Sequence, residues 1–305
     1  METPRLLLTN DDGIDAPGLA ALYEELTAVA DVTVVAPQEN QSGTGRTRTH
    51  RTTREEHPWG YAIDGTPADC AAYGLRGLDT EFDLVVSGIN HGPNAGNYVV
   101  GRSGTVGACI EAAFLETPGI ALSAYHAQDF FVHPPSEYEF SRPARVAREL
   151  VVRTLSGGVF GPEAAADADD GAADFLNVNA PVDVAAADMR LTRPHHDYDL
   201  TVEHGVEETA DIDLGNDESG DIALHDTVWP GTVGWESPFP NDVDLRERYE
   251  VGTDRRALVE GEISVSPLTA PAVAVTTPEL DGMVTGFNES EAARERARSA
   301  ADTDE

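Results

Sequence analysis

The chain contains no lysine, and this is its most unusual lack. All 20 basic residues are arginines, and they stand against 55 aspartates and glutamates, which gives a formal net charge of −35. Such self-repulsion is tolerable where salt screens it, because the Debye length falls to about 3 Å near 1 M salt. The acids are spread along the whole chain and are not gathered in one tail. We therefore expect a halophilic protein from a salt-accumulating cytoplasm.

Other absences narrow the class of protein. The only cysteines are Cys70 and Cys109, which form neither a disulfide framework nor a Cys-x-x-Cys pair, so a reducing compartment is favoured. No apolar run is long enough to span a bilayer, and residues 1–5 are not typical of a secretory leader. A surface this negative argues against nucleic-acid polymers and anionic membranes as partners. We expect a cytoplasmic location.

Strands and helices alternate through the first 190 residues. Apolar runs predict strands, and leucines at helical spacing in residues 16–26 predict a helix after the first of these strands. The strands are expected at residues 6–8, 31–37, 82–87, 118–123 and 175–181. This alternation predicts an α/β fold with a Rossmann-like, doubly wound, mostly parallel sheet.

The pattern changes after about residue 190, where extended segments and acidic loops replace the alternation. A late strand is expected at residues 262–268. A short charged helix is expected at residues 289–298, and an acidic tail follows it. We therefore predict a core over residues 1–190 and a C-terminal extension over residues 191–305.

Polar side chains follow three of the predicted parallel strands. Asp11 and Asp12 come after the first strand, Ser42 lies in the loop after the second, and Asn90 lies after the strand at 82–87. The carboxyl ends of parallel strands meet at one edge of a sheet, so we expect these loops to converge. Their hard oxygen ligands suit Mg²⁺ or Mn²⁺ better than zinc. Taken alone, the two aspartates also fit an Asx turn followed by a helix cap.

A fourth element completes the candidate site. Ser103, Gly104 and Thr105 open a predicted helix with small residues. The free backbone N–H groups and the positive dipole end at such a helix start are a common cradle for phosphate. A metal and an anion cradle at one sheet edge together indicate phosphate ester hydrolysis with a metal-activated water.

A series of motifs in this order resembles the SurE family of 5′/3′-nucleotidases, the survival-protein phosphatases. They are residues 9–14 with 16–18, residues 36–37 with 41–43, residues 65–70, residues 87–94 and residues 103–108, and further along residues 177–179 and 264–268. The resemblance implies a Rossmann-like core, and a homodimer or homotetramer built by exchange of C-terminal segments that include a β-hairpin region.

The resemblance also implies an activity and its residues. The expected reaction is dephosphorylation of nucleoside 5′- and possibly 3′-monophosphates, with one divalent ion (Mg²⁺ or Mn²⁺) in each subunit. The implied metal ligands are Asp11, Asp12, Ser42 and Asn90, of which Asp11, Asp12 and Asn90 are also the implied catalytic residues. The implied phosphate contacts are Asn94, Ser103, Gly104 and Thr105.

Alternatives stay open at this point. Asp11 could be a nucleophile that forms an aspartyl-phosphate, although the resemblance implies direct attack by water. His91 is either a general acid or a hydrogen-bonding surface group. The same site could serve polyphosphate or a sugar phosphate, or a nucleotide-binding module without turnover. The preferred metal, the base selectivity and the choice between 5′ and 3′ substrates are not fixed by the sequence.

The acidic composition generates a first prediction. The free energy of unfolding should increase as KCl is raised from about 0.1 M to about 3 M, because salt screens the repulsion among the excess carboxylates. Denaturation followed by circular dichroism, together with activity after refolding, at each salt concentration measures this. Full stability in dilute buffer would contradict a halophilic origin.

Overall fold

The computed structural model describes residues 3–127, 134–157, 159–160, 172–204, 222–226 and 244–270, and six positions between 278 and 287. The chain divides into two compact units, Met1–Ala270 and Pro271–Glu305. The helix predicted at 289–298 and the acidic segment at 207–221 lie outside the described residues. Among the helices of the described residues, none is both long and apolar enough to cross a membrane.

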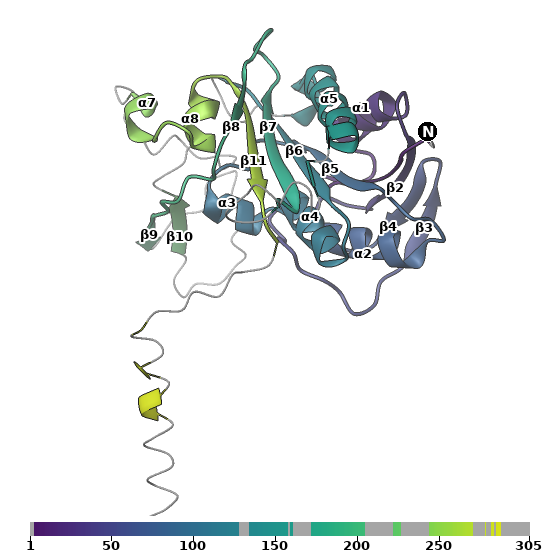
Figure 1. Ribbon diagram of the computed structural model, residues 1–305, viewed down its shortest axis with the longest axis horizontal. Helices are drawn as coiled ribbons and strands as arrows, with labels where there is room; N and C mark the ends of the chain where they lie inside the picture. The colour runs from purple at the N-terminus through teal and green to yellow at the C-terminus, as the bar shows by residue number, and fades with distance from the viewer. Residues whose placement is uncertain are drawn as a thin grey trace, which may run out of the picture. The chain divides into compact units, whose positions relative to one another are not determined.

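A nine-stranded sheet organises the first unit, in the order β3-β4-β2-β1-β5-β6-β7-β11-β8 (Figure 1). Its members are β1 (Arg5–Thr9), β2 (Asp31–Pro37), β3 (Arg54–His57), β4 (Gly60–Ile63), β5 (Leu84–His91), β6 (Gly119–Tyr125), β7 (Phe175–Pro181), β8 (Met189–Leu191) and β11 (Ile263–Leu268). The six neighbouring strands from β4 to β7 are all parallel. The predicted mostly parallel α/β fold is confirmed, and the late strand β11 joins the sheet antiparallel to β7.

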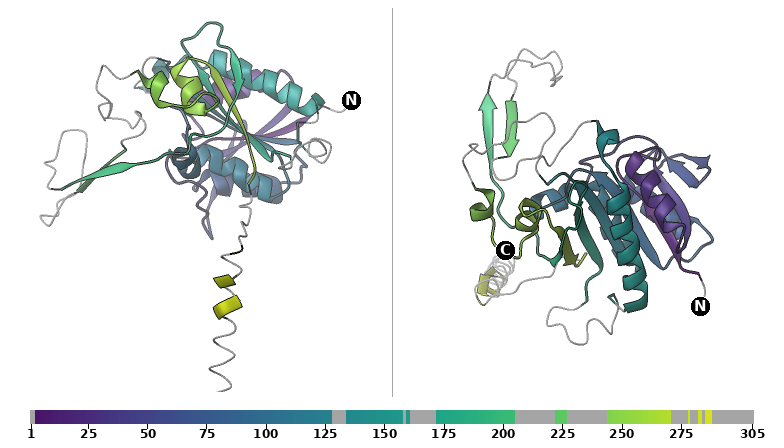
Figure 2. Two further views of the ribbon diagram at one scale, coloured as in Figure 1. Left: turned by 60° about the vertical axis from the view of Figure 1, so that its left-hand side comes forward. Right: turned by 90° about the horizontal axis from the view of Figure 1, so that it is seen from above.

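Helices cover both faces of this sheet (Figures 1 and 2). On one face lie α1 (Pro17–Leu26) and α5 (Ser141–Gly157), and on the other lie α2 (Pro67–Gly77) and α4 (Gly104–Phe114). Leu6 and Leu8 pack in the cluster that includes α1 and α5, whereas Leu7 packs in the cluster that includes α2. Successive side chains of a strand point to opposite faces. The uninterrupted leucine run is therefore explained by a strand buried on both sides.

The strand β5 is longer than the sequence pattern predicts. Residues 88–91 were expected to form a loop because glycine and asparagine are typical of turns, but the strand continues through them to His91. Its register against β6 shifts between Ser87 and Asn90, and Gly88 has a φ of 138°. Glycine here lets the strand deform and continue, which carries Asn90 to the end of the strand.

Several short helices escape prediction. They are α3 (Asn97–Arg102), α7 (Leu245–Arg248), α8 (Asp254–Val259) and the 3₁₀ turn Pro135–Glu137. Each is too short to show a helical period in the sequence. The extended segments and acidic loops predicted after about residue 190 do not include α7 and α8, so these two helices were not predicted.

Two antiparallel strand pairs accompany the parallel strands of the core. The first is β3 with β4 at one edge of the sheet. In the C-terminal part, β9 (Leu200–His204) and β10 (Ile222–Asp226) form a separate antiparallel pair. This ribbon exposes Leu200, Val202, Ile222 and Leu224. Its use in oligomerisation stays a prediction.

The packing of α1 on β5 generates a prediction for Gly18. A Cβ at this position would lie 2.2 Å from the main-chain oxygen of Ile89. Gly18→Ala should therefore lower the free energy of unfolding by about 1–3 kcal/mol, the usual cost of overpacking. Chemical denaturation in high salt measures this.

The matched control is Gly101→Ala in α3, where a Cβ would meet nothing within 4 Å. This change should leave stability unchanged or raise it slightly, because alanine favours the helix. Equal stability of the two variants would contradict the close approach of α1 to β5.

Candidate metal and phosphate site

The candidate site lies where the order of the strands reverses. The chain passes from β1 to β2 on one side, and β5 then pairs with β1 on the other side. Ligands of open α/β sheets bind beyond the carboxyl ends of the strands at this switch point. Asp11 and Asp12 follow β1 there, and Asn90 is the penultimate residue of β5. The backbone N–H of His91 donates to Asp12 Oδ2 over 2.9 Å, which ties the two strand ends together.

Asp11 and Asp12 are adjacent carboxylates withdrawn from water. Asp11 is 2% exposed, and its Oδ1 accepts a hydrogen bond from the Thr105 hydroxyl. Burial raises the pKa of Asp11, although hydrogen bonds from Thr105 and the backbone of Gly104 oppose the shift. Burial and the charge of Asp11 raise the pKa of Asp12 to about 7. The donors around the pair thus compensate only part of its charge, and a bound cation would supply the remainder.

The loop after β2 is fastened to the aspartates through its backbone. The N–H of Gln41 donates to the main-chain oxygen of Asp11 over 2.6 Å, and the side-chain amide of Asn40 donates to Asp12 Oδ1 over 3.2 Å. Ser42 is exposed, and its N–H donates to Asn40 Oδ1. The structure therefore brings the Ser42 loop beside the carboxylates, and Asn40 is a contact that the sequence pattern did not single out.

The side-chain oxygen of Asn90 is the atom of this amide that we expect to meet a ligand. The residue is 9% exposed, and its Nδ2 donates to the main-chain oxygen of Gly92 over 2.6 Å. With the nitrogen engaged, the side chain offers an oxygen acceptor of the kind that hard cations prefer.

The start of α4 lies directly against Asp11. A Cβ on Gly104 would be 2.8 Å from the Cβ of Asp11, so only glycine permits this approach. Ser103 caps the helix by accepting the N–H of Val106 on its Oγ over 3.1 Å. Gly104 and Thr105, two of the residues predicted to cradle phosphate, therefore lie against Asp11, and Ser103 caps the same helix.

Asn94 is held by buried polar residues from two other strands. Its N–H donates to Asn179 Oδ1 over 2.8 Å, and its main-chain oxygen accepts from Asn177 Nδ2 at 2.9 Å and Asn179 Nδ2 at 3.1 Å. Its own Nδ2 donates to Ser123 Oγ over 2.9 Å. The residue pattern gave these three partners no role. The signal in the sequence that could have identified them is the presence of polar residues in β6 and β7, two strands that are buried along their whole length.

The donor set agrees with a hard cation. Among the described residues, no group of three or more histidine, cysteine, aspartate or glutamate side chains could hold a metal. The side-chain oxygens predicted to bind the ion are those of two carboxylates, an amide and a hydroxyl. Such a set suits Mg²⁺ or Mn²⁺ and lacks the nitrogen and sulfur ligands that zinc favours.

His91 lies beside this site, but its ring is engaged in packing. The imidazole meets the ring of Tyr138 edge-on, with centroids 4.5 Å apart, and His126 meets the same tyrosine at 4.8 Å. A general-acid role for His91 stays a prediction.

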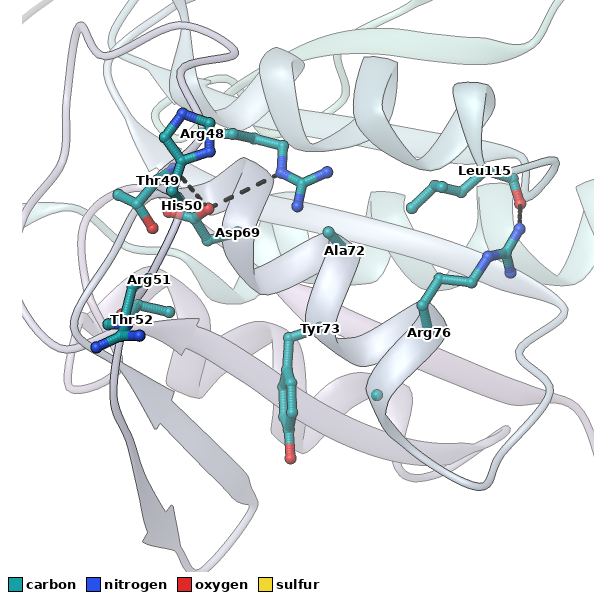
Figure 3. A pocket seen from close by; sticks show the side chains of 11 residues that line it. Arg48, Thr49, His50, Arg51, Thr52, Asp69, Ala72, Tyr73, Arg76 and Leu115 are labelled. Carbon is teal, nitrogen blue, oxygen red and sulfur yellow. Dashed lines mark hydrogen bonds and ion pairs between the residues drawn. The ribbon is translucent and has the colours of Figure 1, made fainter.

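A cleft of about 380 Å³ is lined by residues of α2 and of the loop 48–52, and none of the candidate metal and phosphate residues lines it (Figure 3). Asp69 accepts the N–H of Thr49 over 2.9 Å, and Arg48 lies 4.0 Å from the same carboxylate. Arg48 also pairs with Glu111 of α4 over 3.0 Å. These contacts hold the loop after Gly45 on the helices α2 and α4.

The sequence and the fold both match known proteins. The family model described as survival protein SurE matches residues 6–199. The 5′-nucleotidase SurE of Halobacterium salinarum is 41% identical over 288 residues, covering 94% of this chain and 99% of that protein. The protein of the same name from Methanoregula boonei is 35% identical over 286 residues, covering 90% of this chain and 96% of that protein.

A solved structure agrees with these matches. The SurE protein from Aquifex aeolicus superposes with a TM-score of 0.67 at 29% identity, covering 93% of this chain and all of that one. The residues predicted for the metal and phosphate site, from Asp11 to Thr105, all lie within the matched segment 6–199. The chain belongs to the SurE family.

Proposed function

We propose that this protein is a divalent-metal-dependent phosphomonoesterase that hydrolyses nucleoside 5′-monophosphates to nucleoside and phosphate. The observation that carries this proposal is the pair formed by the buried Asp11 and the half-buried Asp12 at the switch point of the sheet, with Asp11 directly against the first residues of the 11-residue helix α4. The activity named for the SurE relatives supports it. Nucleoside 3′-monophosphates are proposed as further substrates.

In this proposal Asp11, Asp12, Ser42 and Asn90 hold one Mg²⁺ or Mn²⁺ in each subunit. A bound ion supplies a Lewis acid for phosphoryl oxygens and lowers the pKa of a coordinated water. Hydrogen bonds from Gln41 and Asn40 join the loop after β2 to the loop after β1. These bonds hold the two loops that carry the oxygen ligands next to each other.

A ligand role for Asp11 is favoured over a nucleophilic one. One of its oxygens already accepts the Thr105 hydroxyl, and the start of α4 further stabilises its charge. These donors lower the electron density available for attack on phosphorus. The chain also has no lysine to support a phosphoaspartate.

The phosphate group is assigned to the space between Asn94 and the start of α4. Asn94 is fixed in place by Asn177 and Asn179, and the N-terminus of α4 adds backbone donors and a positive dipole end. These groups would orient the phosphoryl centre and stabilise negative charge that develops on its oxygens.

Two other functions use the same residues. A polyphosphate or sugar phosphate could take the place of the nucleotide, and a binding module could hold a nucleotide without turnover. Binding alone needs only the helix start, whereas a pair of adjacent buried carboxylates is costly unless it serves a cation. Phosphate release from a panel of phosphorylated compounds in high salt, with each divalent ion and after chelation, separates these functions.

Removal of one carboxylate should abolish most of the activity. Asp11→Asn should lower kcat/KM for a nucleoside monophosphate by about a hundredfold or more, because even indirect partners of a metal cost ten- to a hundredfold. The control is Asp15→Asn, which removes the same charge from an exposed position in the same loop and should leave turnover unchanged. Full activity of Asp11→Asn would contradict the metal site.

Metal affinity should depend on pH through the aspartate pair. Because burial and Asp11 raise the pKa of Asp12 to about 7, a cation must displace a proton below that pH. Mn²⁺ affinity should therefore fall by about fifteenfold between pH 7, where Asp12 is about half protonated, and pH 5.5. Calorimetric titration in two buffers of different ionisation enthalpy measures both the affinity and the protons released.

The same shift has a consequence for stability. The folded state holds the Asp12 proton more tightly than the unfolded state does, so this group's contribution to the stability of metal-free protein declines as pH rises from about 4 to about 7. Asp12→Asn should remove that decline. A Mn²⁺ affinity that is the same at pH 7 and at pH 5.5 would contradict the proposed role of Asp12.

A further inference from the structure

The loop that carries Asn94 is anchored at a second point, two residues further on. Gly96 precedes α3, and it has a φ of 87°. Its N–H donates to Asp254 Oδ2 over 2.7 Å, across 158 residues of sequence. The last third of the chain therefore contacts the loop proposed to bind phosphate.

Asp254 is a junction of three segments. The side chain is fully buried, and its Oδ1 accepts the N–H of His195 at 2.8 Å and the N–H of Arg255 at 2.7 Å. Its two oxygens thus receive backbone donors from the loop before α3, from the segment before the β9–β10 ribbon and from α8.

Neighbouring contacts leave little freedom around this junction. Arg255 is fully buried, and its Nε donates to the main-chain oxygen of Ala95 over 3.4 Å. A Cβ on Gly96 would lie 2.6 Å from the Arg255 guanidinium, so the loop approaches as closely as glycine allows. The N–H of Asn97 donates to the main-chain oxygen of His195 over 2.8 Å.

We infer that Asp254 is a positioning residue for the phosphate-binding loop. It fixes Gly96, and thereby the direction in which Asn94 is presented and the path of α3 toward Ser103, which caps α4. Asp254 lies outside the segment 6–199 that matches the family model. The inference rests on the proposed function, because it takes Asn94 and the start of α4 as the phosphate contacts.

The test uses Asp254→Asn in the full-length protein. An amide of the same shape has one oxygen, so in either orientation its NH₂ group faces a backbone N–H that the carboxylate had accepted. We expect kcat/KM for a nucleoside monophosphate to fall by about ten- to a hundredfold, mainly through a higher KM, because small displacements of positioning groups have effects of this size. The affinity for inorganic phosphate should fall by a similar factor, and Mn²⁺ affinity should stay within about twofold.

The matched control is Thr253→Ala. This neighbouring side chain is 1% exposed and caps α8 by accepting the N–H of Arg256 over 3.3 Å, and the hydrogen bonds described for its hydroxyl are with Glu250 and Arg256 and not with the loop at Gly96. Its loss should lower stability through the helix cap and leave KM and phosphate affinity unchanged. If Asp254→Asn does not fold, Asp254→Glu keeps the charge and both oxygens but displaces them by one methylene, and the same change in KM is expected.

The outcomes separate the inference from the proposed function. Unchanged KM and phosphate affinity in Asp254→Asn would overturn the positioning role, and so would a loss of affinity equal to that of Thr253→Ala. A wild-type protein that binds phosphate but releases none from any substrate would refute the proposed function. In that case the phosphate titration of the variants still decides the role of Asp254.

Discussion

Two adjacent carboxylates, the buried Asp11 and the half-buried Asp12, are the constraint on which this site depends. Isolated buried charges are costly, and a like charge next door adds to the cost. Part of this cost is offset by hydrogen bonds from the Thr105 hydroxyl, the backbone at the start of α4, the N–H of His91 and the side-chain amide of Asn40. Because burial still raises the pKa of both aspartates, the compensation is incomplete. The remaining imbalance is what favours a cation.

Other buried carboxylates of the chain are treated differently. Glu111 is 5% exposed and pairs with Arg46 at 3.3 Å and Arg48 at 3.0 Å. Asp69 is 6% exposed, and it receives the N–H groups of Thr49 and Thr66. A protein with only 20 arginines for 55 acids thus places arginine beside Glu111. Among the described ion pairs, none joins an arginine to Asp11 or Asp12, in contrast to Glu111.

The sequence was sufficient for the parts of the molecule that local pattern controls. The leucine run at β1, the helix α1 and the strands β2, β6 and β7 lie where periodicity predicts them. The continuation of β5 through Gly88 could not be predicted, because the same residues are typical of a turn. The partners of Asn94 escaped for another reason. Ser123, Asn177 and Asn179 lie 29 or more residues away, and no local pattern records a contact of that range.

The chemistry of each partner follows from the backbone groups that it meets. At Asn94 the main chain offers both a donor and an acceptor, and the amide of Asn179 satisfies both with one side chain. At Asp254 three backbone N–H groups, that of Gly96 among them, donate to the two carboxylate oxygens. Among side chains of this shape, only a carboxylate has an acceptor at each of its two terminal atoms and no donor. An amide at residue 179 and a carboxylate at residue 254 are therefore not interchangeable, because the loop at residues 94–96 meets one partner that both donates and accepts and another that only accepts.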